Sequence, residues 1–132
     1  MHRIHAPKSR QRGLSMFGFL FVAVLLVLAA MVAMKLVPAY IEFFSVKKIL
    51  NAMSQDGSLS AKSNAEIRSD FGKRASVDYV TGVKPEQLVI DRRGGGAVVS
   101  VDYEFRTKLI GNVSLVVDFS ASTDPNRVPR IE

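Results

Sequence analysis

A run of about 21 residues without a charged side chain, residues 14–34, constrains this chain more than any other feature. As an α-helix rising about 1.5 Å per residue, the run would be roughly 30 Å long, which matches the hydrocarbon thickness of a bilayer. We therefore predict one transmembrane helix at residues 14–36. This feature decides compartment and topology, but it names no biochemical activity.

The basic charge of the chain is concentrated before this run. The net charge is +6, and from Lys35 onward basic and acidic residues nearly balance. Four basic residues lie in a short tail without acids, namely Arg3, Lys8, Arg10 and Arg12. This asymmetry follows the positive-inside rule and does not indicate nucleic-acid binding. We predict a basic cytoplasmic tail at residues 1–13, able to contact anionic lipid headgroups.

Two alternatives to an uncleaved signal anchor stay open at the N-terminus. One is a cleaved secretory signal with a weak cleavage site at residues 37–39, although the apolar core of such a signal is about 7–15 residues long and this run is longer. The other is a prepilin-like leader, because basic residues, Gly13 and an apolar helix follow one another as in type IV prepilins. That family has a glutamate at the fifth residue after the glycine, where this chain has Gly18.

The residues after the span suffice for one small domain, which we place at residues 37–124, with a flexible tail at residues 125–132. The N-terminal helix is expected to continue into this domain, because apolar side chains recur there every three or four residues. They are Phe43, Val46, Ile49, Leu50 and Met53. Pro38 is placed to kink this helix, and residues 55–58 contain its stop signal.

A second helix and several strands are predicted farther along. Ser63 and Glu66 fit a capping box that starts a helix at residues 63–72, with Gly72 as its C-cap. Alternating apolar and polar residues predict antiparallel strands at residues 87–91, 97–106 and 113–120. A fourth, edge strand at residues 76–80 is an open alternative. The expected fold class is α+β, with a three-stranded or four-stranded antiparallel meander.

Histidine and cysteine, which serve most often in catalysis and zinc binding, are missing from the predicted outer domain. The chain has no cysteine, which excludes disulfides, thiolate nucleophiles and zinc–thiolate sites. Its two histidines, His2 and His5, lie in the N-terminal tail. A Ser-His-Asp site in the domain is therefore excluded. We expect no enzymatic activity, no cofactor, no metal ion and no small-molecule substrate.

Two weaker motifs contain residue types found in enzymes. Ser45 and Lys48 have the Ser-x-x-Lys spacing of penicillin-binding enzymes, but the further motifs of those enzymes are missing. Three carboxylates are predicted on one face of neighbouring strands: Asp102, Glu104 and Asp118. Carboxylates can serve acid–base chemistry or bind calcium, yet their alternation with apolar residues favours an exposed face on which Arg106 pairs with Glu104. A small hydrolase or transferase is therefore the least favoured function.

Two pairs of residues are candidates for contacts with other molecules. Arg92 and Arg93 precede three glycines at a hairpin tip, without the ending of a P-loop, and could contact a partner or a lipid headgroup. Ala29 and Ala33 have the small-xxx-small spacing that supports helix association in membranes. An interfacial aromatic belt is expected just after the span, at Tyr40, Phe43 and Phe44.

Five short segments, each weak alone, carry a resemblance in their order along the chain. They are Gln11-Arg12-Gly13-Leu14-Ser15, Lys35-Leu36-Val37-Pro38-Ala39-Tyr40, Val83-Lys84-Pro85-Glu86-Gln87-Leu88, Val101-Asp102-Tyr103-Glu104, and Gly111-Asn112-Val113 through Asp118-Phe119. With them the chain resembles a domain-of-unknown-function family of small single-span proteobacterial membrane proteins, often encoded beside signal peptidase I and ribonuclease III. The resemblance implies an inner-membrane protein, but no reaction and no catalytic residue.

These features favour a non-enzymatic accessory or binding subunit in the bacterial inner membrane, with its domain in the periplasm. Its expected partners are membrane lipids and either another membrane protein or further copies of itself, as a homo-oligomer. The alternative is a pilin-like or pseudopilin-like assembly subunit, because a long half-membrane helix leading into an antiparallel sheet has that outline.

Overall fold

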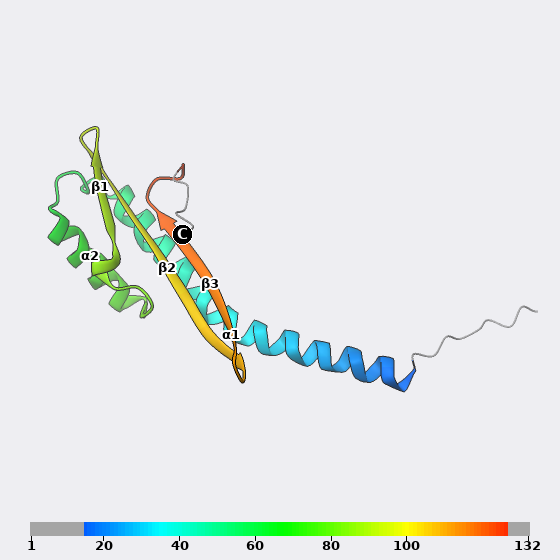
Figure 1. The fold of residues 1–132 in the computed structure, drawn as a ribbon. Helices are drawn as coiled ribbons and strands as arrows, with labels where there is room; N and C mark the ends of the chain where they lie inside the picture. The colour runs from blue at the N-terminus through cyan, green and yellow to red at the C-terminus, as the bar shows by residue number, and fades with distance from the viewer. Residues whose placement is uncertain (1–14, 127–132) are drawn as a thin grey trace, which may run out of the picture.

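The computed structural model describes residues 15–126, which form two helices, one 3-10 turn and one sheet (Figure 1). In chain order the elements are α1 (Met16–Gln55), α2 (Asn64–Val77), η1 (Pro85–Gln87), β1 (Val89–Arg93), β2 (Gly96–Ile110) and β3 (Val113–Ser122). Within the described residues the sheet has three antiparallel strands in the order β1-β2-β3. The predicted α+β layout is confirmed.

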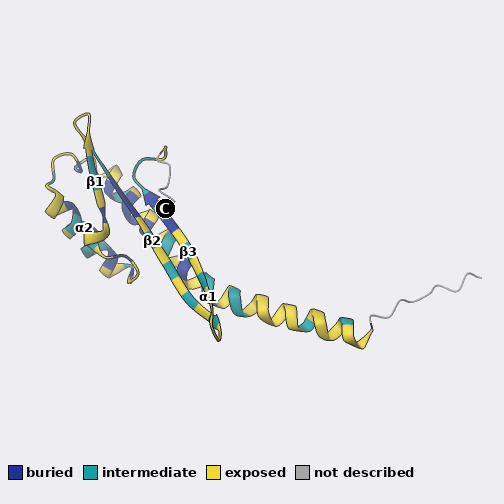
Figure 2. Cartoon of the chain, in the orientation of Figure 1, coloured by how far each residue is buried: buried dark blue, intermediate teal, exposed yellow. Residues whose placement is uncertain are grey.

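Helix α1 has two halves with opposite surroundings. Its N-terminal half is apolar and exposed, and α1 is the one helix in the described part of the chain long and apolar enough to cross a membrane. Its C-terminal half buries Val46, Ile49 and Leu50 against the domain (Figure 2). Pro38 lies between the halves and lacks the N–H that a straight helix would use. Figure 1 shows that α1 changes direction between its exposed half and the half that packs on the sheet.

Helix α1 begins with a side-chain cap. Ser15 is the N-cap, and its hydroxyl accepts a hydrogen bond from the Gly18 N–H at 3.2 Å. This helix is compatible with a single-pass membrane anchor. The predictions for residues 1–13, including His2 and His5, lie outside the described residues, as does most of the predicted tail at residues 125–132.

Helix α2 begins as expected but ends later. The capping box is formed: Ser63 Oγ accepts from the Glu66 N–H, and the Ser63 N–H donates to Glu66 Oε2 at 2.7 Å. These hydrogen bonds from Ser63 lower the pKa of Glu66. The predicted end at Gly72 is wrong, because the helix continues to Val77 and its buried stripe extends to Ala75.

Gly72 has a packing role instead of a capping role. A Cβ at this position would lie 3.1 Å from Cγ of Pro85, so glycine lets α2 approach η1 closely. The alternative fourth strand at residues 76–80 is also wrong. Ser76 and Val77 are still helical, and Asp78 and Tyr79 form the turn that follows.

The sheet has three strands at one end and two at the other. Strand β1 pairs only with the first residues of β2, from Val89 opposite Ser100 to Arg93 opposite Gly96. Strand β3 pairs with β2 from Ser100 down to Ile110. Strand β2 therefore begins one residue before the predicted strand at residues 97–106 and ends four residues after it, because Thr107 and Leu109 continue the alternation. Below β1, strands β2 and β3 form a two-stranded ribbon along α1 (Figure 1).

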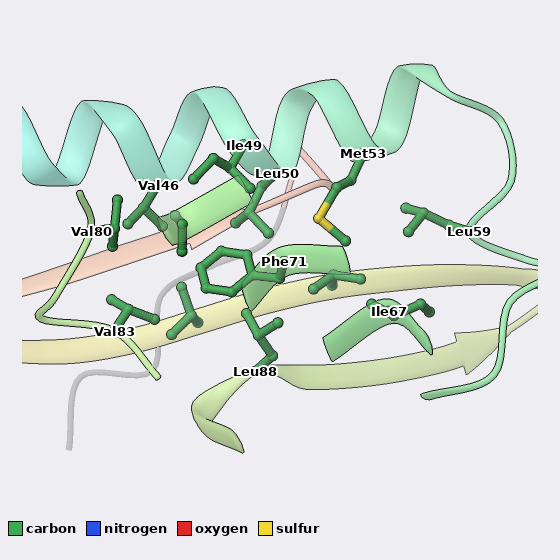
Figure 3. Packing of buried hydrophobic residues seen from close by; sticks show 14 residues of the cluster. Val46, Ile49, Leu50, Met53, Leu59, Ile67, Phe71, Val80, Val83 and Leu88 are labelled. Carbon is green, nitrogen blue, oxygen red and sulfur yellow. The ribbon is translucent and has the colours of Figure 1, made fainter. Parts of the chain in front are cut away.

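One hydrophobic core lies between the two helices and the sheet. Phe71 of α2 is at its centre, below Leu50 of α1 and above Leu88 (Figure 3). Val99 and Val101 are fully buried on the inner face of β2, whereas the alternate residues Asp102 and Glu104 are exposed on its outer face. The core thus holds the domain half of α1 rigidly against the sheet, next to the apolar half.

Candidate functional site

Glu42 of α1 joins the helix to the loop after α2, just outside the apolar half. Its Oε1 accepts hydrogen bonds from the backbone N–H groups of Thr81 and Gly82. A Cβ on residue 82 would lie 3.2 Å from the same oxygen, so glycine permits this close approach. Sequence reasoning missed this contact. The available signal was that Glu42 is the only acidic residue before Asp56.

An aromatic cluster around Phe119 of β3 packs the sheet on α1. The ring of Phe119 lies 4.8 Å from Phe43, 5.2 Å from Tyr40 and 5.3 Å from Tyr103, measured between centroids. Two of the three aromatics expected at the membrane interface therefore pack within the domain. Phe44, the third, is 60% exposed.

Tyr103 has a buried hydroxyl without a hydrogen-bond partner among the described residues. Burial, followed by the nearby charge of Glu42, raises the pKa of Tyr103 to about 12. Both effects disfavour the phenolate. The raised pKa contributes to the stability of the folded state. This contribution is complete below pH 10, the pKa of an exposed tyrosine, and is lost as the pH rises through about 12.

Tyr103→Phe is expected to stabilise the domain at neutral pH. The change removes an unsatisfied buried hydroxyl, whose cost is typically about 1–3 kcal/mol, while keeping the ring on Phe119. Urea unfolding at pH 7 measures the gain. Repeating the urea unfolding between pH 10 and 12 checks the cause. Ionisation of Tyr103 contributes to the loss of stability of the unmodified protein in this range, and this contribution should be missing in the variant. Tyr79→Phe, at a side chain 88% exposed, is the matched control. A loss of stability at pH 7 would contradict the prediction.

The two candidate arginines of the β1–β2 hairpin have different surroundings. Arg92 donates to the Asn64 side chain at 3.0 Å, to the Ser60 carbonyl at 3.3 Å and to the Lys62 carbonyl. It thus ties the hairpin to the segment between α1 and α2. Arg93 has a side chain that is 84% exposed, with one surface ion pair to Asp91 at 2.9 Å. Arg93 is therefore the member of the pair that faces outward.

Arg92→Ala is expected to lower the free energy of unfolding by about 1–3 kcal/mol. The substitution leaves two backbone carbonyls and one amide oxygen without their charged donor. Arg93→Ala is the control, and it should change stability by less than about 1 kcal/mol, as is usual for a surface ion pair. Thermal and urea unfolding of the two variants measure the difference. Equal losses would contradict the distinction between the two residues.

The three carboxylates that the sequence singles out lie on the exposed outer face of β2 and β3. Glu104 lies opposite Asp118 across β2 and β3, and Arg106 neutralises Glu104 through an ion pair of 2.9 Å. Asp102 accepts from the Ser120 hydroxyl. No group of three histidine, aspartate or glutamate residues within this part of the chain is placed to hold a metal ion.

Ser45 and Lys48 lie three residues apart on α1, about one helical turn. Lys48 lines an open pocket of about 270 Å³ between α1 and α2, and Ser45 does not line it. The other charged residues around this pocket are Lys73, Arg74 and Asp78. Arg74 is already paired, with Asp56 at 2.8 Å and with Asp70 at 3.4 Å.

The predicted association pair lies on an exposed face of α1 that continues beyond the span. Ala29 and Ala33 are both exposed. Further apolar side chains follow on the same face of the helix at intervals of three or four residues. Their exposed fractions are 54% at Val37, 62% at Ile41 and 60% at Phe44. The domain covers the opposite side of the helix, at Val46, Ile49 and Leu50. We call Ala29, Ala33, Val37, Ile41 and Phe44 the open face of α1.

Comparison with curated proteins and with solved structures finds no match. A family model matches residues 35–119, which is more than half of the chain. The matched segment begins where the uncharged run ends and covers the domain half of α1, α2 and all three strands up to Phe119. It contains Glu42, the aromatic cluster and both arginines of the hairpin. The chain therefore belongs to the family described as Domain of unknown function (DUF4845).

Proposed function

We propose that this protein is a non-enzymatic binding or accessory subunit of a membrane complex in the bacterial inner membrane. Its N-terminus lies in the cytoplasm and its domain in the periplasm. The observation that carries this proposal is the open face of α1, which presents apolar side chains both within the uncharged run and beyond it.

Lipid alone cannot cover the outer part of the open face. Phe44 is ten residues after Met34, about 15 Å along the helix axis. The headgroup region adds only about 5–8 Å on each side of the hydrocarbon core. Ile41 and Phe44 lie beyond this region and are both more than half exposed, and exposed apolar side chains that lie together are typical of a protein contact. Small residues at Ala29 and Ala33 allow a second helix to approach closely inside the bilayer. A helical membrane protein, or a second copy of this chain, could cover both the part of the open face inside the bilayer and the part beyond it.

The orientation is supported by the charges at the two ends of the span. The tail before it carries four basic residues and no acid. Beyond it, Lys35 donates to the Lys108 carbonyl and Lys47 lies over the Phe43 ring at 5.6 Å, so both lysines are held by the domain. Fusion of alkaline phosphatase to the C-terminus tests the orientation. We expect an active fusion, whereas an inactive one together with an active cytoplasmic reporter would overturn it.

Photo-crosslinking of the full chain in its native membrane tests the partner. A photoreactive side chain at Phe44 should give a discrete adduct, while the same group at Val89, on β1 and equally accessible at 54%, should not. The mass of the adduct separates a second copy from another membrane protein. Ile41→Asp should abolish the adduct and leave the unfolding transition unchanged. Labelling at Phe44 no greater than at Val89 would contradict the proposal.

A pilin-like assembly subunit is the second candidate. The half-exposed helix with an antiparallel sheet packed on its other half favours it. Gly18, in the first turn of α1, stands where that class has a glutamate. The mass of the mature chain decides between the two: a start at Leu14 supports the pilin-like candidate, and retention of residues 1–13 excludes it.

A further inference from the structure

The lower end of the β2–β3 ribbon is apolar and lies beside the apolar half of α1. We call residues 109–113 the hairpin tip; its turn uses Gly111 with a φ of 54°. Figure 1 shows this tip next to α1, at the end of the ribbon farthest from the β1–β2 turn. An apolar pocket of about 280 Å³ separates the two, lined by Leu28, Met31, Val32, Leu109, Ile110 and Val113.

The position of this pocket along α1 indicates how deep the hairpin tip would lie in a membrane. Its α1 residues lie inside the uncharged run, with Val32 two and Leu28 six residues before Met34. These offsets correspond to about 3 and 9 Å along the helix axis. The run has about the length that a bilayer core requires, so a membrane that takes up the whole run also reaches the hairpin tip.

The charges around the tip fit a membrane interface. Lys35, the first charged residue after the run, donates through Nζ to the carbonyl of Lys108, which lies just above the tip. The two lysines thus form a basic pair at the level where anionic headgroups would lie. Below them, Ile110 and Val113 are 56% and 55% exposed, so the outermost side chains of the tip are apolar.

The backbone limits how deeply the ribbon can enter. Below β1, strands β2 and β3 pair with each other, and each has an outer edge without a neighbouring strand among the described residues. Unpaired N–H and C=O groups are costly in hydrocarbon. The turn and its apolar neighbours can therefore enter the boundary of the bilayer, while the charged part of the ribbon stays in water.

We propose that the hairpin tip inserts into the periplasmic leaflet as a second membrane contact, with Lys35 and Lys108 at the headgroups. This inference rests on the membrane span of α1 and does not require the protein partner. Two contacts restrict the rotation of the domain about the span. The open face of α1 is then held in one orientation towards its neighbours in the membrane.

Single labels on the full chain test the insertion directly, because the protein has no cysteine of its own. Asn112→Cys places an environment-sensitive fluorophore in the turn of the tip. Phe21→Cys places it in the span, and Arg93→Cys places it on the outward-facing hairpin. Each variant is reconstituted in phosphatidylethanolamine–phosphatidylglycerol vesicles. Lipids brominated on their acyl chains and iodide in the buffer are the two quenchers.

Insertion predicts that the Asn112 label loses fluorescence with brominated lipid and is protected from iodide, as is the Phe21 label. The Arg93 label should show the opposite pattern. Quenching of the Asn112 label by iodide would overturn the inference, and so would protection from both quenchers, which would show that protein covers the tip. If the Phe21 label also fails to respond to brominated lipid, the span itself is overturned, so the two failures are distinguishable.

Val113→Asp, combined with the label at residue 112 or at residue 21, provides a second test in which the labelled positions stay the same. A charge at this position should move the tip into water, so the Asn112 label becomes accessible to iodide while the Phe21 label stays protected. Val116→Asp, on the same strand but outside the pocket, should leave both labels unchanged. Equal effects of the two aspartates would contradict a specific role for the tip.

Discussion

Phe71→Ala is expected to lower the free energy of unfolding by about 3–5 kcal/mol, the usual cost of truncating a buried phenylalanine. Phe71 has no exposed surface, and it lies between Leu50 of α1 and Leu88 (Figure 3). The lost ring leaves a cavity that the surrounding helices and sheet cannot easily close. Small domains have a total stability of about 5–15 kcal/mol, so this variant loses a large part of it.

Urea unfolding of the full chain in detergent micelles, followed by near-ultraviolet circular dichroism, measures the effect of Phe71→Ala. Val77→Ala on the same helix is the control, because that side chain is 74% exposed and should change stability by no more than about 0.5 kcal/mol. If both variants unfold at the same urea concentration, α2 does not pack on the core as described.

Local patterns along the chain were sufficient to predict the main elements. The uncharged run and the apolar spacing from Phe43 to Met53 predict one long helix, and α1 has that form. Ser63 and Glu66 form the expected capping box, since its hydrogen bonds span only three residues. Alternation along β2 and β3 predicts strands with one buried face. These features are predictable because the residues that cause them are close in sequence.

The errors arose where distant residues decide the role of a side chain. Gly72 resembled a helix end, but it lies within the helix and lets Pro85, thirteen residues later, approach closely. Arg92 and Arg93 looked equivalent, and they are distinguished by the contacts of Arg92 with Ser60, Lys62 and Asn64, which are distant in sequence. The open face of α1 could be recognised only after the sheet had been placed on the other side of the helix.

Glu42→Ala is expected to lower the free energy of unfolding by about 2–3 kcal/mol. The carboxylate accepts from Thr81 and Gly82, and a hydrogen bond to a charged group contributes about 1.5–3 kcal/mol. The expected loss is smaller than the summed range of about 3–6 kcal/mol for two such hydrogen bonds, because the contact is exposed to water.

The pKa of Tyr103 gives a second, independent readout of the same contact. Burial is the larger cause of its rise to about 12, and the charge of Glu42 is the other. Glu42→Ala should therefore lower this pKa part of the way towards 10, so the alkaline loss of stability still begins near pH 10 but ends at a lower pH and is smaller in the variant. Absorbance titration at alkaline pH measures the shift. Glu86→Ala, at an exposed carboxylate of η1, is the matched control and should leave both stability and the Tyr103 titration unchanged. An unchanged Tyr103 pKa in Glu42→Ala would show that burial alone raises it, and would remove Glu42 from the electrostatics of the aromatic cluster.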